Sequence, residues 1–121
     1  ACMEAMQGPQ DAVVRMHDEY ARRRRYMMDR LNAMSGVRCP DAKGAFYVFP
    51  NVGALYGKSD GKRSIRNSSD LAAYLLEEAH VAVVPGVAFQ APEHLRLTYA
   101  SSMENIIEGM DRMEAALQKL K

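Results

Sequence analysis

The sequence predicts an α/β (α+β) fold, a two-layer sandwich in which helices pack mainly on one face of a small mixed sheet. Apolar residues recur every three or four positions over about 9–35, which is the pattern of a helix with one buried side. Short runs rich in aromatic and branched residues at 45–49, 81–84 and 95–99 are typical of strands. The 121 residues fit one domain, so a single domain over 1–121 is expected.

The long helix at about 9–35 has clear end signals. It begins after Gly8-Pro9, since proline is tolerated in the first turn, and it ends at Ser35-Gly36, where glycine favours a helix stop. Its apolar stripe consists of Val13, Met16, Tyr20, Met27, Leu31 and Met34.

Two shorter helices are predicted in the second half of the chain. Ser68 or Ser69 would cap a helix that runs to about Ala79. The spacing of Ser101 and Glu104 is that of a capping box, in which each side chain bonds a free backbone N–H of the first helical turn. A closing helix is therefore expected directly after this pair.

Four strands are expected between the helices. Val37–Cys39 is predicted as a short edge strand and Ala45–Phe49 as a central one. Val81–Val84 is predicted as a short buried strand, followed by Pro85-Gly86 at the two central positions of a type II turn. Leu95–Tyr99 alternates with period two and completes the sheet.

Composition excludes several classes of function. A formal net charge of +1 does not suggest a nucleic-acid binder, which usually carries a strongly basic face. No apolar run approaches the roughly 20 residues that span a bilayer, and no signal-peptide pattern opens the chain. Cys2 and Cys39 form no Cys-x-x-Cys pair, which favours a reducing compartment. We therefore expect a cytoplasmic protein that binds neither nucleic acid nor membranes.

Some residue groups partly match functional motifs but lack the required spacing. Gly53 and Gly57 enclose three residues ahead of Lys58-Ser59, whereas a phosphate-binding P-loop needs four. The basic run Arg22–Arg25 lies on consecutive helical positions that point in different directions, which favours a solvated helix over a basic face. No metal site is expected, because the histidines share no ligand spacing: His17, His80 and His94.

Arg96 is the residue that calls for an explanation. It lies in the middle of a predicted strand, between Leu95 and Leu97, where a charge must reach water, pair with an acid or face a ligand. The pattern alone favours an exposed arginine on the polar side of a half-buried strand. A ligand role stays open as the alternative, because the planar guanidinium can give a carboxylate two parallel hydrogen bonds.

Three ordered segments resemble class I (fold-type I) pyridoxal-phosphate-dependent aminotransferases of the aspartate aminotransferase type. Gly44–Pro50 is similar to the first strand of their C-terminal small domain, and Leu75–Phe89 to its helix–strand–turn unit. His94–Ala100 resembles the strand that carries the substrate arginine. Gly8 through Asn32 is similar to the long helix between the large and small domains, so the resemblance makes the helix at about 9–35 an interdomain helix.

The resemblance also implies roles for individual residues. By its position in the motif, Arg96 would bind the α-carboxylate of the substrate, and Phe46 would line the substrate cleft. Phe89, just after the Pro-Gly turn, would also border the cleft. Gln90 stands where the family usually has glycine, which puts the conformation of this loop in question.

The resemblance implies a cofactor that this chain is not expected to hold. The family's Schiff-base lysine lies in a Ser-x-x-Lys segment, and Lys43, Lys58 and Lys62 lack that context. The family's cofactor-ring contacts belong to the large domain. We therefore expect pyridoxal phosphate in the parent enzyme, and in this chain neither a catalytic residue nor a bound cofactor. The isolated chain is expected to be inactive.

The resemblance points to a parent enzyme of amino-acid metabolism and biosynthesis, a homodimer that moves an amino group between an amino acid and a 2-oxo acid. The aspartate/2-oxoglutarate pair is the expected substrate class, although the sequence does not identify the amino acid. The missing large domain would be the partner of this domain, which would close over the active site. The alternative is a stand-alone, non-catalytic ligand-binding or interaction domain that reuses the fold.

Overall fold

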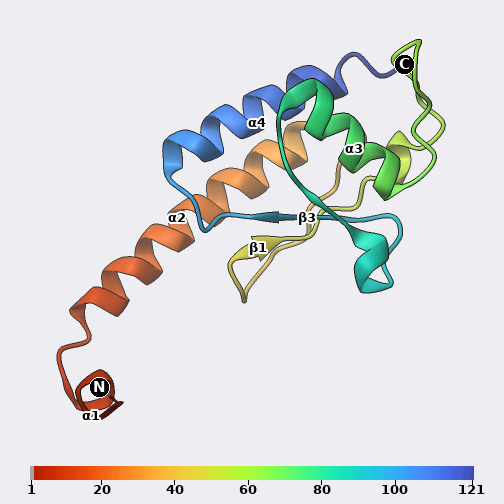
Figure 1. Ribbon diagram of the computed structural model, residues 1–121. Helices are drawn as coiled ribbons and strands as arrows, with labels where there is room; N and C mark the ends of the chain where they lie inside the picture. Colours follow the sequence, from red (N-terminus) through yellow and green to blue (C-terminus); the bar gives the residue numbers. More distant parts are fainter. Residues whose placement is uncertain (1) are drawn as a thin grey trace.

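The computed structural model describes residues 2–121, with helices gathered on one side of a short sheet (Figure 1). The α-helices within that range are α1 (Cys2–Gln7), α2 (Asp11–Ala33), α3 (Ser68–Ala79) and α4 (Met103–Leu117). The strands are β1 (Tyr47–Val48), β2 (Val84–Pro85) and β3 (Leu95–Thr98). Two 3-10 turns accompany them, η1 (Gly53–Leu55) and η2 (Gly86–Phe89).

The sheet of the described residues has the order β1-β3-β2, and both neighbouring pairs are antiparallel. The expected mixed sheet is therefore wrong. The connection from β1 through α3 to β2 makes these two strands run in the same direction, as an alternation of strands and helices usually does. However, β3 lies between them and runs against both, so no parallel pair forms.

The strands are shorter than their sequence patterns indicate. Only two residues of the run at 45–49 belong to β1, and Ala45 turns away from it with φ of 61°. The expected edge strand at 37–39 is reduced to a single bridge between Arg38 and Asn51. The run at 81–84 contributes only its last residue to β2.

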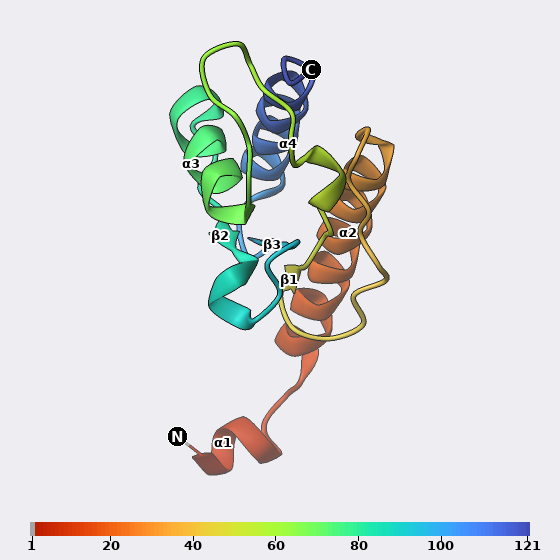
Figure 2. The same ribbon diagram turned by 90° about the vertical axis from the view of Figure 1, so that its right-hand side faces the viewer.

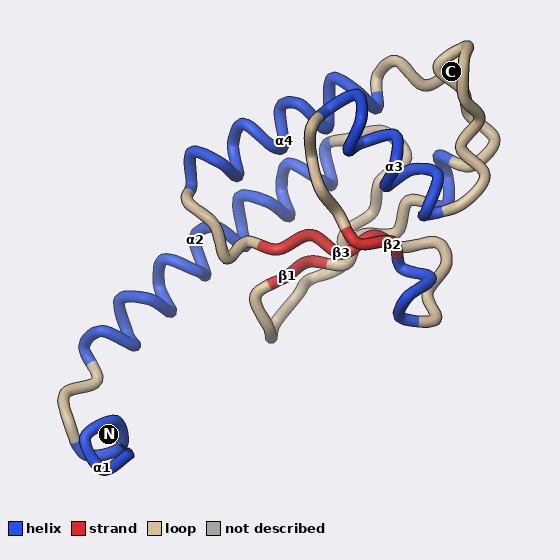
Figure 3. Tube along the Cα trace, in the orientation of Figure 1, coloured by secondary structure: helices blue, strands red, loops and turns tan. Residues whose placement is uncertain are grey.

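The helices pack on the sheet through one apolar core. Figures 1 and 3 show α2, α3 and α4 on the same side of the strands, and Figure 2 shows the same grouping after a quarter turn. Arg30 of α2 pairs with Asp111 and Glu114 of α4 at 2.7 and 2.9 Å. The fully buried side chains include Leu31, Leu55, Ile65, Leu71, Tyr74, Leu75, Leu95 and Met113.

The stripe predicted along α2 is buried only in its second half. Met27, Leu31 and Met34 belong to the core. Val13 and Met16, at the other end of the stripe, are 54% and 55% exposed, so the described residues do not bury this part of the stripe. Figures 1 and 2 show why: α1 and the first turns of α2 extend away from the rest of the molecule. The apolar period continues along the whole of α2, but within residues 2–121 the core does not reach the start of the stripe.

Both predicted helix caps lie one or two residues from the observed ones. The cap of α3 is Asn67, whose Oδ1 accepts a hydrogen bond from the N–H of Asp70 at 2.9 Å. The cap of α4 is Ser102, whose hydroxyl accepts from the N–H of Asn105 at 3.2 Å. Short polar side chains are adjacent at both starts, and each can serve as a cap.

Position 86 has no room for a side chain, so glycine is required there. The type II turn predicted for Pro85-Gly86 is wrong. Pro85 has the extended φ and ψ of −65° and 137°, but Gly86 does not have the positive φ that such a turn needs at its second central residue. A Cβ added at Gly86 would lie 2.2 Å from the carbonyl oxygen of Ala91 and 2.4 Å from that of His94. Backbone fills the space beside this glycine.

Replacing Gly86 with alanine should therefore destabilise the protein by about 2–4 kcal/mol, because backbone atoms have to move. The matched control is Gly109→Ala in α4, where an added Cβ meets nothing within 4 Å. That change should stabilise the helix by about 0.5–1 kcal/mol. Urea unfolding of the two variants and of the unchanged protein checks whether the free energy of unfolding falls for Gly86→Ala and rises for Gly109→Ala. Equal stabilities for the two variants would contradict the packing described here.

Candidate functional site

Arg96 lies at the centre of the sheet, on the face that points away from the core. Its neighbours along β3, Leu95 and Leu97, are buried, while Arg96 is half-buried and Thr98 is exposed. The predicted alternation of this strand is thus confirmed. In the ladder, Arg96 stands opposite Val84 of β2. The arginine therefore leaves the sheet on the side that the helices do not cover.

The guanidinium of Arg96 lies over two aromatic rings. Its central carbon Cζ is 4.8 Å from the ring centroid of Phe89 and 5.5 Å from that of Tyr47. Rings at these distances attract a cation through their negative faces. Within residues 2–121, no acidic side chain forms an ion pair with Arg96. The planar fork of donors is consequently available for an anion.

A second layer of rings stands behind Phe89. The rings of Phe49 and Phe89 meet edge to face, with centroids 6.0 Å apart and ring planes at 85°. Phe49 also stacks against the imidazole of His94, with centroids 4.9 Å apart and planes 12° from parallel. The buried Nδ1 of His94 has no hydrogen-bond partner in the described part of the chain. Three aromatic side chains thus lie in a row that ends at Arg96.

The structure does not place Phe46 against Arg96. The ring of Phe46 is 58% exposed and meets the ring of Tyr47 at 6.3 Å. Its backbone carbonyl accepts hydrogen bonds from the N–H of Tyr99 and the hydroxyl of Thr98 at 3.0 and 3.1 Å. The ring beside Arg96 belongs instead to the next residue, Tyr47.

Tyr47 is the residue of this site that sequence reasoning missed. It pairs with Thr98 across the β1–β3 ladder, and directly opposed residues share one face of a sheet. Thr98 and Arg96 also share a face, since they are two residues apart on β3. The register of the two strands would have placed Tyr47 beside Arg96, but the sequence does not specify that register.

Gln90 ends η2 in the left-handed conformation. This residue adopts the left-handed conformation, with φ of 58° and ψ of 24°, which is the conformation that glycine enters without strain. Its N–H donates to the carbonyl oxygen of Val87 at 3.2 Å. Gln90 thus ends η2 directly after Phe89 and fixes the backbone at that point.

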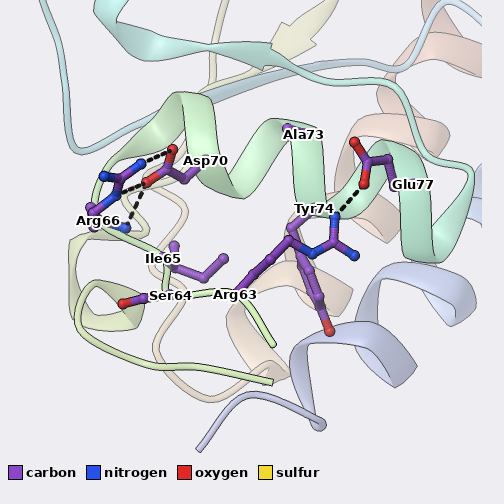
Figure 4. Close-up of a pocket in the computed structure, with 8 residues that line it drawn as sticks. All are labelled: Arg63, Ser64, Ile65, Arg66, Asp70, Ala73, Tyr74 and Glu77. Atoms are coloured by element: carbon purple, nitrogen blue, oxygen red, sulfur yellow. Dashed lines mark hydrogen bonds and ion pairs between the residues drawn. The ribbon is translucent and has the colours of Figure 1, made fainter. Parts of the chain in front are cut away.

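A separate hollow beside α3 also contains arginines, but both of them are paired. Its volume is about 390 Å³, and it is shown in Figure 4. Arg66 donates to Asp70 at 2.8 Å, and this hydrogen bond lowers the pKa of the Asp70 carboxyl. Arg63 reaches Glu77 on the same wall. Because these guanidinium groups are already neutralised, the hollow is a weaker anion site than the face that carries Arg96.

The other motifs considered in the sequence do not form sites. Gly57-Lys58-Ser59 enters a tight hairpin closed by the bridge between Ser59 and Ser64, and no helix follows directly as in a P-loop. In the basic run, Arg22 and Arg23 both bind Glu19. Residues 2–121 contain no group of three side chains suited to a metal ion. Over the same range, no helix is both long enough and apolar enough to cross a bilayer.

Comparison with known proteins identifies the family. The model of the family "Aminotransferase class I and II" matches residues 1–113. An aspartate aminotransferase of Streptomyces avermitilis is 43% identical over 119 residues, which cover 98% of this chain and 29% of that protein.

Solved structures agree. The crystal structure of the aspartate aminotransferase from Rhizobium meliloti matches with a TM-score of 0.95 at 38% identity, over 99% of this chain and 30% of that one. An aromatic aminotransferase from Pyrococcus horikoshii matches with a TM-score of 0.76 at 39% identity, over 89% of this chain and 27% of that one. The chain spans about 30% of the length of the relatives that it matches. From sequence and structure together, it belongs to the class I and II aminotransferases.

Proposed function

We propose that this chain is the C-terminal small domain of an aspartate-aminotransferase-type enzyme, which moves an amino group between an amino acid and a 2-oxo acid. In this proposal Arg96 binds the α-carboxylate of the substrate. The observation that carries the proposal is the guanidinium of Arg96, which contacts two rings and, within residues 2–121, pairs with no acid. The family membership supplies the reaction class.

The geometry suits recognition of a carboxylate. A guanidinium can donate two parallel hydrogen bonds to one carboxylate, and this fixes the direction of the group as well as its position. With the carboxylate clamped, the Cα–H bond of an amino acid has a defined orientation, so part of the entropic barrier to the reaction is removed on binding. Phe89, 44% exposed, and Phe46 are proposed to border the cleft in which the rest of the substrate lies.

The exposed start of α2 supports the proposal that the parent protein contains a second, larger domain. Val13, Val14 and Met16 lie on this segment and are each more than half exposed. Contiguous apolar surface of this kind usually marks an interaction site. We therefore propose that α2 joins this domain to the large domain of the parent, which would cover these residues, and that the helices and sheet form a two-layer sandwich closing over the active site. A cytoplasmic homodimer is proposed for the parent.

Enzymes of this family generally depend on pyridoxal phosphate, which supplies an electron sink when bound. The groups that the structure places against Arg96 do not fit this cofactor. They are two aromatic rings, and neither offers an amine for the cofactor's carbonyl or an acid for its ring nitrogen. We propose that the large domain of the parent contributes those groups, and the role of this chain is confined to the substrate.

Replacing Arg96 with alanine in the full-length parent enzyme should lower kcat/KM for the amino acid by about 100- to 1,000-fold, because two charge-assisted hydrogen bonds are lost. Arg96→Lys should fall between alanine and arginine, since lysine keeps the charge without the fork. Arg112→Ala is the control, because the Arg112 guanidinium pairs with Glu108 on the exposed side of α4, and within residues 2–121 with no other side chain. Steady-state kinetics of the three variants checks this, and an unchanged kcat/KM for Arg96→Ala would refute the proposed role.

The isolated chain should be unable to transfer amino groups. Incubated with pyridoxal phosphate, aspartate and 2-oxoglutarate, it should form no glutamate above the rate of the cofactor alone, because the groups around Arg96 cannot hold the cofactor. The full-length enzyme under the same conditions is the positive control. Enzyme-dependent glutamate formation by the 121-residue chain would instead point to a complete site within it.

A further inference from the structure

We propose that Tyr47 and Phe89 form an aromatic bracket that holds the guanidinium of Arg96 in one orientation, and that both are positioning residues for the substrate carboxylate. This inference rests on the proposed role of Arg96 and extends it to the residues that act through it. The two contacts that carry it are those of the Arg96 Cζ with the ring faces of Phe89 and Tyr47, at 4.8 and 5.5 Å.

The bracket restrains the arginine without using its donors. An arginine side chain has many rotamers, and each one that points away from the ligand lowers the fraction of protein ready to bind. A guanidinium is weakly hydrated and stacks readily on aromatic faces. Aromatic rings attract the cation without a strong acceptor, whereas an internal carboxylate would occupy the same N–H groups that the substrate needs. Two rings therefore align Arg96 and leave its fork free.

The rings reach Arg96 from the two strands beside it. Tyr47 belongs to β1 on one side of β3, where it pairs with Thr98. Phe89 is the last residue of η2, which directly follows β2 on the other side of β3. The central position of β3 thus allows its arginine to be flanked from both neighbours, which an edge strand does not permit.

The ring of Phe89 is itself supported. Phe49 meets it edge to face at 6.0 Å, and the imidazole of His94 stacks on Phe49 at 4.9 Å. The left-handed conformation of Gln90 fixes the end of η2 immediately after Phe89. A partly exposed phenylalanine without such support would change rotamers freely, so the support adds to the case that Phe89 has a fixed place over Arg96.

The bracket can be tested on the chain without substrate or cofactor. A proton above an aromatic face is shifted upfield, so the Arg96 Nε–H resonance should lie upfield in a ¹H–¹⁵N spectrum. Phe89→Leu and Tyr47→Leu should each move it back, whereas the control Phe46→Leu should not. Both bracket rings are partly exposed, at 44% and 38%, so neither change should prevent folding. An Arg96 resonance that is the same in all three variants would overturn the proposal.

Kinetics of the full-length parent enzyme test the consequence for binding. Phe89→Leu and Tyr47→Leu should each raise KM for the amino acid by about fivefold to tenfold, the factor expected for one cation–π contact, with kcat changed less than about twofold. Phe89→Tyr and Tyr47→Phe keep a ring and should restore KM. Leu76→Ala, an exposed apolar residue on α3, is the control for nonspecific loss.

A double substitution separates the two proposals. In an Arg96→Ala background, which leaves no cation for the rings to hold, Phe89→Leu should change kcat/KM by less than about twofold, because its effect passes through Arg96. If Arg96→Ala leaves kcat/KM unchanged, the proposed function fails. If Arg96→Ala is severe while both ring removals leave KM unchanged, only the bracket fails. Equal effects of Phe89→Leu with and without the arginine would also overturn it.

Discussion

The guanidinium of Arg96, half-buried and surrounded by rings, is the constraint from which the site is built. A charge removed from water needs compensation, and an acid would be the usual source. Here the compensation within residues 2–121 comes from the faces of Tyr47 and Phe89. Arg63 and Arg66 of the same molecule are compensated in the usual way, by ion pairs with Glu77 and Asp70. The two kinds of arginine differ in what remains for a ligand: the paired ones have their donors filled, whereas Arg96 keeps its fork free.

The topology of the sheet makes this arrangement available. The strand β3 is last in sequence but central in space, so a residue on its open face has neighbours on both sides. Gly86 lets the backbone turn closely past Ala91 and His94, which brings η2 and its phenylalanine back toward β3. The core on the other face holds Leu95 and Leu97 and thereby fixes which way Arg96 points. Packing of Leu95 and Leu97 on one face of β3 thus determines that the guanidinium of Arg96 lies on the other face.

The sequence was sufficient for the main helices and for the central arginine, but not for the lengths and pairing of the strands or for the neighbours of Arg96. Period-two alternation placed Arg96 opposite the core because Leu95 and Leu97 leave only one face for it. The expected mixed sheet was wrong, because the order of elements along the chain does not reveal that β3 lies between β1 and β2 and runs against both. For the same reason the sequence did not reveal Tyr47 as a neighbour of Arg96: one residue of register exchanges the faces of a strand. Register is set by long-range pairing, which no local pattern records.

The two halves of the long helix α2 lie in different environments. Its second half behaves as an ordinary core helix, tied to α4 by Arg30 with Asp111 and Glu114. The first half has the same apolar period, but Val13 and Met16 lie exposed on a segment that extends beyond the sheet. A stripe that continues past the edge of its own core is best explained by a second body that buries the remainder. Under the proposed function, that body would carry the cofactor. A rigid helix shared between the two would then transmit the placement of Arg96 relative to it.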